Sequence, residues 1–194
     1  MAMMAPQKAG ALEVRALRII QTEDHPLYLF MLRANQILEL ADIPRVSRDE
    51  AGKLTGYQRP EVKEHVQGIV QYLNGDLPIF PNSIIVALPS GVRFRSTRGG
   101  NRHPDDGVSD TGRLLIPLPE EGKPKPASIV DGQQRALALA QSRRRDFPVP
   151  ITAFIADTVK LQQEQFVRVN HTKQLPRGRI AEFLPEVNSP FRHG

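Results

Sequence analysis

The sequence predicts a domain of the α/β or α+β class, because strand-like and helix-like segments interleave along the chain. Short apolar runs rich in β-branched residues recur between turn-forming residues, which is typical of strands. Between them lie stretches whose apolar residues repeat at helical spacing. The 17 prolines fall mostly at the ends of these segments, so they separate elements of a fold instead of indicating disorder.

The first half of the chain contains the clearest single elements. Strands are predicted over residues 11–20, over the start of residues 26–43 and over residues 83–88. The strand that opens residues 26–43 is expected to become a helix near Ala34. Pro60 suits a first helical turn, and the helix that it opens is expected to stop at Asn74-Gly75.

The second half continues the alternation. Strands are predicted over residues 92–94, 113–118, 127–130 and 149–156, and helices over residues 133–145, 161–170 and 177–184. The length of 194 residues suits one domain. We expect a flexible N-terminus over residues 1–10, the domain over residues 11–188 and a short tail over residues 189–194.

Residues 95–112 are polar and glycine-rich and show no apolar periodicity, which predicts a mobile loop between two strands. An exposed hairpin insertion is the favoured interpretation. Contact with nucleic acid is a weaker alternative, based on four basic or imidazole side chains: Arg95, Arg98, Arg102 and His103.

Composition excludes several classes of function. The chain has no cysteine, which rules out a disulfide scaffold, thiol catalysis and thiolate metal sites. No run approaches the ~18 apolar residues of a membrane-spanning helix. The N-terminal residues lack the apolar core of a signal peptide. We therefore expect a cytoplasmic protein without a membrane partner.

The net charge of +5 is concentrated in the last third of the chain. Residues 1–122 carry a net charge of −1 and residues 123–194 carry +6. A basic region favours a polyanion such as DNA, although charge alone favours the plainer alternative of a solvated basic surface. The arginines that we expect to follow a DNA backbone are Arg143, Arg144, Arg145, Arg177 and Arg179.

The best local motif is the turn Asp131-Gly132-Gln133-Gln134-Arg135, which joins a predicted buried strand to a predicted helix. Gly132 permits a sharp turn. The helix that follows points free N–H groups and the positive end of its dipole at the turn, and this arrangement binds anions. Arg135 can add a phosphate contact, and Asp131 can orient Arg135, hold a metal or position water. The alternative is that Asp131 caps the helix and Arg135 is a surface residue.

Two further segments carry candidate binding residues. Gln58 and Arg59 precede the helix at Pro60, where a cation is unfavourable for the dipole unless it meets an anion. The alternative is a pairing of Arg59 with Glu61 or Glu64. Asn170 ends another predicted helix, where it could serve as a C-cap. The sequence contains no phosphate-binding P-loop, no zinc-protease motif and no hydrolase serine elbow.

Five segments in order give the chain a specific resemblance over residues 10–188. They are GYQR, PNSIIVAL, SIVDGQQRALAL, VPITAFI and QEQFVRVNHTKQLP. In this order they resemble the DGQHR-domain family, which includes the DndB proteins of DNA phosphorothioation systems and the DpdB proteins of 7-deazaguanine modification. Gln134 stands where the family usually has histidine, so this side chain cannot shuttle protons at neutral pH.

The family is similar in turn to the ParB/sulfiredoxin-like fold, which implies a small mixed sheet flanked by helices. In that superfamily a Gly-x-x-Arg turn, here Gly132 to Arg135, cradles nucleotide phosphates. The resemblance implies ATP or another nucleoside triphosphate with Mg²⁺. It assigns phosphate and pocket contacts to Gln58, Arg59, Gly132, Gln133, Asn170 and Lys173. The missing cysteine excludes the sulfiredoxin reaction itself.

From the resemblance we expect a component of a DNA modification or restriction system that binds a nucleotide and acts with DNA and with other proteins of its cluster. ATP hydrolysis, with nicking of DNA as a further activity, would be carried out by Asp131, Gln134 and Arg135, with Asp131 as the metal ligand. Two alternatives stay open, a DNA-binding regulator without enzymatic activity and an adaptor subunit. The oligomeric state is also left open.

Overall fold

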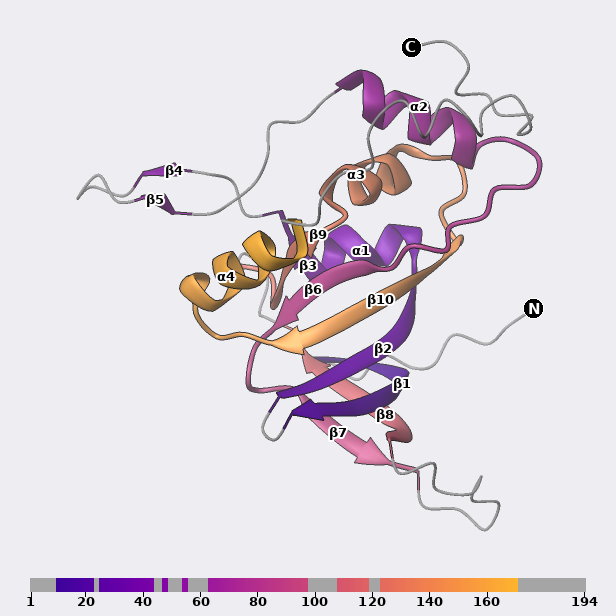
Figure 1. Ribbon diagram of the computed structural model, residues 1–194. Coiled ribbons are helices and arrows are strands. Elements are labelled where there is room, and N and C mark those ends of the chain that lie inside the picture. Colours follow the sequence, from indigo (N-terminus) through magenta and orange to yellow (C-terminus); the bar gives the residue numbers. More distant parts are fainter. Residues whose placement is uncertain are drawn as a thin grey trace.

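Eight strands form one mixed, curled sheet in the order β3-β9-β6-β10-β2-β1-β8-β7 (Figure 1). The computed structural model describes residues 10–22, 25–43, 47–48, 54–55, 63–97, 108–118 and 123–170. The strands of the sheet are β1 (Ala11–Thr22), β2 (His25–Arg33), β3 (Ala41–Asp42), β6 (Ile84–Leu88), β7 (Arg93–Ser96), β8 (Ser109–Pro117), β9 (Ala127–Asp131) and β10 (Pro148–Ile155). A separate two-stranded sheet pairs β4 (Ser47–Arg48) with β5 (Leu54–Thr55).

Four helices belong to the described residues, and they lie on both faces of the sheet. They are α1 (Ala34–Leu40), α2 (Lys63–Leu73), α3 (Gln133–Gln141) and α4 (Val159–Asn170). Helices α1, α2 and α3 share one core with the sheet, to which they contribute the fully buried Ile37, Val66 and Leu139. Helix α4 packs over β9 on the other face, where Leu161 and Phe166 contact a small second cluster.

Alternation along the central strands defines the two faces of the sheet. Tyr28, Phe30 and Leu32 of β2 are buried, whereas Met31 between them is 53% exposed. The same period of two places Ile151 of β10 in the core. Because successive strand side chains point to opposite faces, every second residue of β1, β2, β8 and β10 faces away from helices α1, α2 and α3.

The predicted alternation of strands and helices is confirmed, and the change from strand to helix occurs at Ala34 as expected. The sheet is larger than the small sheet that the resemblance implied. The helix predicted over residues 133–145 ends earlier, at Gln141, because the Ser142 hydroxyl donates to the Leu139 carbonyl and Ser142 leaves the helical conformation. The helix predicted over residues 177–184 lies outside the described residues.

The loop predicted over residues 95–112 was too long at both ends. Strand β7 continues to Ser96 and β8 begins at Ser109, and the register pairs Arg95 with Arg113 and Ser96 with Gly112. A Cβ atom at Gly112 would lie 2.4 Å from the Arg95 carbonyl oxygen. Glycine therefore lets the two strands approach closely, although in the sequence it suggested a loop. Residues 98–107, the N-terminal residues 1–9 and the tail are not among the described residues.

Tyr28 is a buried phenol whose ionisation is coupled to folding. Burial raises its pKa above the ordinary value of 10.0, and the nearby Arg18 acts in the opposite direction. The unfolded chain therefore loses this proton first as the pH rises, and folding stability falls. We expect the contribution of Tyr28 to be intact below about pH 10 and lost above it, so Tyr28→Phe should make the alkaline decline shallower. Urea unfolding from about pH 8 to about pH 11 measures this, and equal declines in both proteins would contradict it.

Candidate functional site

The turn between β9 and α3 has the geometry that its sequence predicts. Gly132 is the N-cap residue of α3 and has the left-handed conformation, with φ 88° and ψ 21°. A Cβ atom at this position would lie 3.1 Å from both the Ile84 Cγ1 atom and the Arg135 Nη2 atom. Backbone conformation and close packing thus both require glycine here. Asp131 precedes the N-cap residue. The alternative in which Asp131 caps the helix is therefore wrong.

Arg135 ties the start of α3 to the segment that precedes β6. Its Nη2 atom donates to Asp131 Oδ2 at 2.9 Å, so Asp131 does orient Arg135. Its Nη1 atom donates to the carbonyl oxygens of Asn82 and Ser83 at 2.8 and 3.1 Å. The guanidinium carbon also lies 5.8 Å from the centre of the Phe80 ring, within range of a cation–π interaction. Both terminal nitrogens of Arg135 are therefore already engaged by the protein itself.

Gln133 is the unusual side chain of the turn. It is only 8% exposed, and its Nε2 atom has no hydrogen-bond partner among the described residues. A buried donor without a partner costs about 1–3 kcal/mol. The first turn of α3 also lacks a side-chain cap. An acceptor-bearing ligand at this point would satisfy both the amide and the free N–H groups of the helix.

A pocket of about 490 Å³ opens beside the turn. Residues 131–135 form one wall, and Gln134, which is partly exposed, lies in it. Helix α2 supplies His65, Ile69 and Tyr72, and α4 supplies Phe166. The Tyr72 hydroxyl donates to the Ile79 carbonyl at 2.9 Å and accepts from the Ile79 N–H at 2.7 Å, which fixes the segment that carries Phe80 against α2.

The α2 and α4 walls of the pocket were not predicted as site residues. His65, Ile69 and Tyr72 follow one another at spacings of four and three, which places them on one side of a helix. That spacing was the available signal, but it is equally typical of a core-facing stripe. Phe166 could not be recognised in this way, because its approach to the turn depends on how α4 packs on β9.

Several predicted site residues lie outside the described part of the chain. These are Gln58, Arg59, Lys173, Arg177 and Arg179. Asn170 is the last residue of α4, four positions after Phe166, and the structure describes its backbone only. The nucleotide and DNA contacts assigned to these residues stay predictions.

The arginines after α3 connect the ends of two helices. Arg144 Nη2 donates to the Gly75 carbonyl at 2.6 Å, and the Arg143 backbone N–H donates to Asn74 Oδ1 at 2.9 Å. Arg145 Nη1 reaches the Ala140 carbonyl at 3.4 Å. All three side chains are exposed. Arg144 therefore has a structural contact in the turn after α2, and the expected DNA contacts of the three residues stay predictions.

Asp131 is the pocket's candidate metal ligand, and one of its oxygens is already paired with Arg135. Within the described residues, no group of three or more histidine, aspartate or glutamate side chains lies close enough to hold a metal ion. Asp131 is also the only carboxylate that lines the pocket in this part of the chain. A cation here would therefore need most of its ligands from water or from a bound phosphate.

Comparison with protein families decides the context of this site. The family model of DNA-sulfur modification-associated proteins, DndB, matches residues 14–183. The chain belongs to the DndB family. The resemblance seen in the sequence motifs is thereby confirmed, and this DndB-family protein is associated with DNA phosphorothioate modification systems. No curated protein and no solved structure matches the chain. None of the helices in the described ranges is long and apolar enough to cross a membrane.

Proposed function

We propose that this DndB-family protein binds a nucleoside triphosphate, ATP or a relative, in the pocket beside Gly132, as a cytoplasmic, DNA-associated component of its modification system. The observation that carries the proposal is the buried Gln133 amide, which has no partner and lies at the uncapped start of α3. A phosphate oxygen is the acceptor that would satisfy this donor together with the neighbouring backbone N–H groups.

The rest of the pocket suits the remainder of a nucleotide. Tyr72, Phe80 and Phe166 present aromatic surface on which a base can stack. Arg135 pairs with Asp131 and also donates to the segment before β6. The end of the pocket that would bind phosphate is therefore in place before the nucleotide binds. Such preorganisation reduces the entropy that binding would otherwise cost.

Mg²⁺ would enter with the nucleotide. This ion keeps several waters and binds through one or two carboxylates plus substrate phosphates. Asp131 would supply the single carboxylate of such a site, and its Oδ2 atom already accepts a hydrogen bond from Arg135. Gln134 can donate and accept hydrogen bonds, so we assign it the orientation of an attacking water. ATP hydrolysis, with nicking of DNA as a further activity, is part of the same proposal.

The test of nucleotide binding is Gln133→Leu. Leucine has a similar volume and removes the unpaired donor, so the fold should be as stable as the wild type or more stable. Binding of ATP with Mg²⁺ should weaken roughly 5- to 100-fold, which corresponds to a loss of about 1–3 kcal/mol. Calorimetric titration measures this, with Gln141→Leu at the exposed end of the same helix as the matched control. Equal affinities of both variants, or no binding by the wild type, would contradict the proposal.

Turnover is tested separately. Phosphate release with plasmid DNA should be lost in Asp131→Ala and Arg135→Ala.

If the wild type releases no phosphate but binds DNA, the protein is a regulator. The net charge of +5 favours this function as the second candidate. If it does neither, the adaptor alternative holds. Digestion of host DNA would distinguish a phosphorothioate linkage, which gives a sulfur-containing dinucleotide, from the 7-deazaguanine modification that the sequence motifs also allowed, which gives a modified nucleoside.

A further inference from the structure

Arginines occupy matching positions on β1, β8 and β7, the last three strands at one end of the sheet. The register places Arg15 of β1 directly opposite Arg113 of β8, and Arg113 directly opposite Arg95 of β7. Arg93 lies two residues from Arg95 and so shares its face. All four are exposed on the face that points away from the core. We call these four residues the arginine row.

The arginine row is poorly neutralised by the protein. Arg113 pairs with Glu13, the only acidic residue that β1, β8 and β7 place on this face. In the same part of the chain, the side chains of Arg15, Arg93 and Arg95 have no hydrogen bond or ion pair. Like charges directly opposite each other destabilise a sheet. Folding alone therefore does not explain why Arg15, Arg113 and Arg95 lie directly opposite one another, whereas binding of an anionic partner does.

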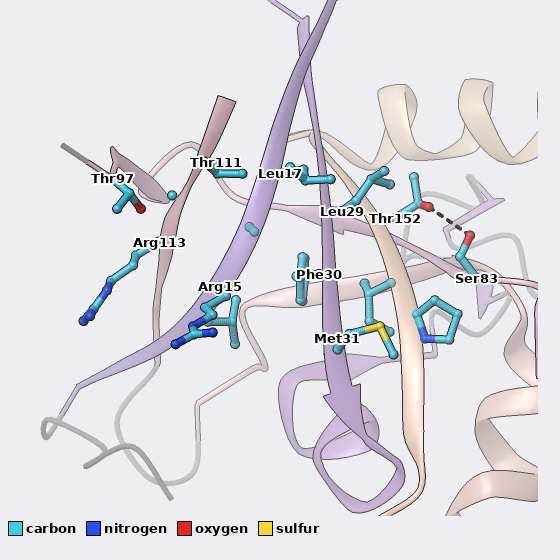
Figure 2. A pocket seen from close by; sticks show the side chains of 15 residues that line it. Arg15, Leu17, Leu29, Phe30, Met31, Ser83, Thr97, Thr111, Arg113 and Thr152 are labelled. Atoms are coloured by element: carbon cyan, nitrogen blue, oxygen red, sulfur yellow. Dashed lines mark hydrogen bonds between the residues drawn. The ribbon is translucent and has the colours of Figure 1, made fainter. Parts of the chain in front are cut away.

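A hollow of about 1020 Å³ adjoins the row on the same face. Figure 2 shows Arg15 and Arg113 on one side of this hollow and Thr152 and Ser83 on the other, joined by a hydrogen bond of 2.9 Å between their hydroxyls. Between the two sides, Leu17 and Met31 are 36% and 53% exposed. This side of the sheet, which points away from the main core, is called the open face below. It combines the cations of the arginine row with an apolar floor and with hydroxyl groups at its edge.

We propose that this open face of the sheet, with the arginine row as its main contact, binds the phosphate backbone of DNA. Neighbouring strands are about 4.8 Å apart, so Arg15, Arg113 and Arg95 span about 10 Å, over which duplex DNA presents several phosphates. Arginine binds phosphate through two parallel hydrogen bonds. DNA is favoured over an anionic membrane or an acidic protein because the family is associated with DNA modification.

The proposal deepens the proposed function, on which it rests, because it names the surface for the DNA on which the nucleotide site would act. It differs from the main sequence prediction, which placed DNA along the arginines after α3, and shares Arg95 with the weaker alternative of nucleic-acid contact in residues 95–112. The two sites meet at Ser83, whose carbonyl accepts from Arg135 and whose hydroxyl bonds with Thr152. DNA on the open face would therefore lie next to the nucleotide pocket without blocking it.

The test is the double variant Arg95→Gln/Arg113→Gln, measured by fluorescence anisotropy with a labelled DNA duplex. We expect affinity to fall at least tenfold, and the dependence of log affinity on log salt concentration to lose about two units, roughly one for each phosphate contact. The matched control is Lys160→Gln/Arg168→Gln, which removes the same charge from exposed positions of α4. Relief of like-charge repulsion should keep the double variant folded.

Three results would overturn the proposal. The double variant and its control could bind DNA equally well, or Arg143→Gln/Arg145→Gln could lose binding while the double variant keeps it. The wild type could also bind vesicles of anionic lipid and not DNA. Calorimetry with ATP and Mg²⁺ separates this proposal from the nucleotide site, because the double variant should bind ATP normally and Gln133→Leu should bind DNA normally.

Discussion

Replacement of Gly132 by valine is expected to lower the free energy of unfolding by about 3 kcal/mol and to abolish nucleotide binding. The left-handed conformation of Gly132, with φ 88°, is costly for any residue with a Cβ atom and most costly for a β-branched one. The new side chain would also meet Ile84 and Arg135 at 3.1 Å. Relief of this contact requires the turn to open, which separates Arg135 from Asp131. Urea unfolding and calorimetric titration with ATP measure the two effects.

Gly68→Val is the matched control for this prediction. Gly68 lies within α2, and a Cβ atom there would meet nothing within 4 Å beyond its chain neighbours and the backbone of its own helix. Valine and glycine differ only modestly in helix propensity, so the control should change stability by less than about 0.5 kcal/mol. A loss of stability in Gly132→Val no larger than that of the control would show that the turn does not depend on glycine.

Leu139→Ala is expected to cost about 2–5 kcal/mol of unfolding free energy. Leu139 is fully buried on α3, where its side chain packs in the main core beneath the sheet. Removal of a buried leucine side chain loses its transfer free energy and leaves a cavity. Because α3 also begins at the candidate site, the loss should be accompanied by weaker nucleotide binding. Urea unfolding with a fixed slope measures the stability change.

The control lies two residues earlier on the same helix. Leu137 is only partly buried against the same core, so Leu137→Ala removes the same atoms from a less enclosed position. Its cost should be clearly smaller than that of Leu139→Ala. A larger cost for Leu137→Ala would mean that α3 faces the core with a different side than the structure shows.

The sequence predicted most elements correctly because their signals are local. The β-branched run of β6 and the strand-to-helix change at Ala34 are both visible within a few residues. The curled shape and the number of strands in the sheet were not predictable, since they depend on pairing between distant segments. The pairing of β7 with β8 is an example: Arg95 and Gly112 look like loop residues until their strands are placed side by side.

The same contrast between local signals and contacts of distant segments applies to the candidate site. The turn at Gly132 was predicted because a strand, a glycine and a helix start are adjacent in the chain. The engagement of Arg135 by the Asn82 and Ser83 carbonyls was not, because those residues are more than 50 positions away. The unpaired side-chain amide of Gln133 was also not predictable from the sequence. Only the packed structure shows that no described residue accepts a hydrogen bond from it.

Binding of a nucleotide phosphate at the start of α3 is what the proposed function requires first. The most direct measurement is a two-dimensional nitrogen–proton NMR titration of the isotope-labelled protein with a non-hydrolysable ATP analogue and Mg²⁺. The largest shifts should fall on the backbone amides of Gly132, Gln133 and Gln134 and on the Gln133 side-chain amide. Shifts that gather elsewhere in the protein, or no shifts at saturating analogue, would contradict it.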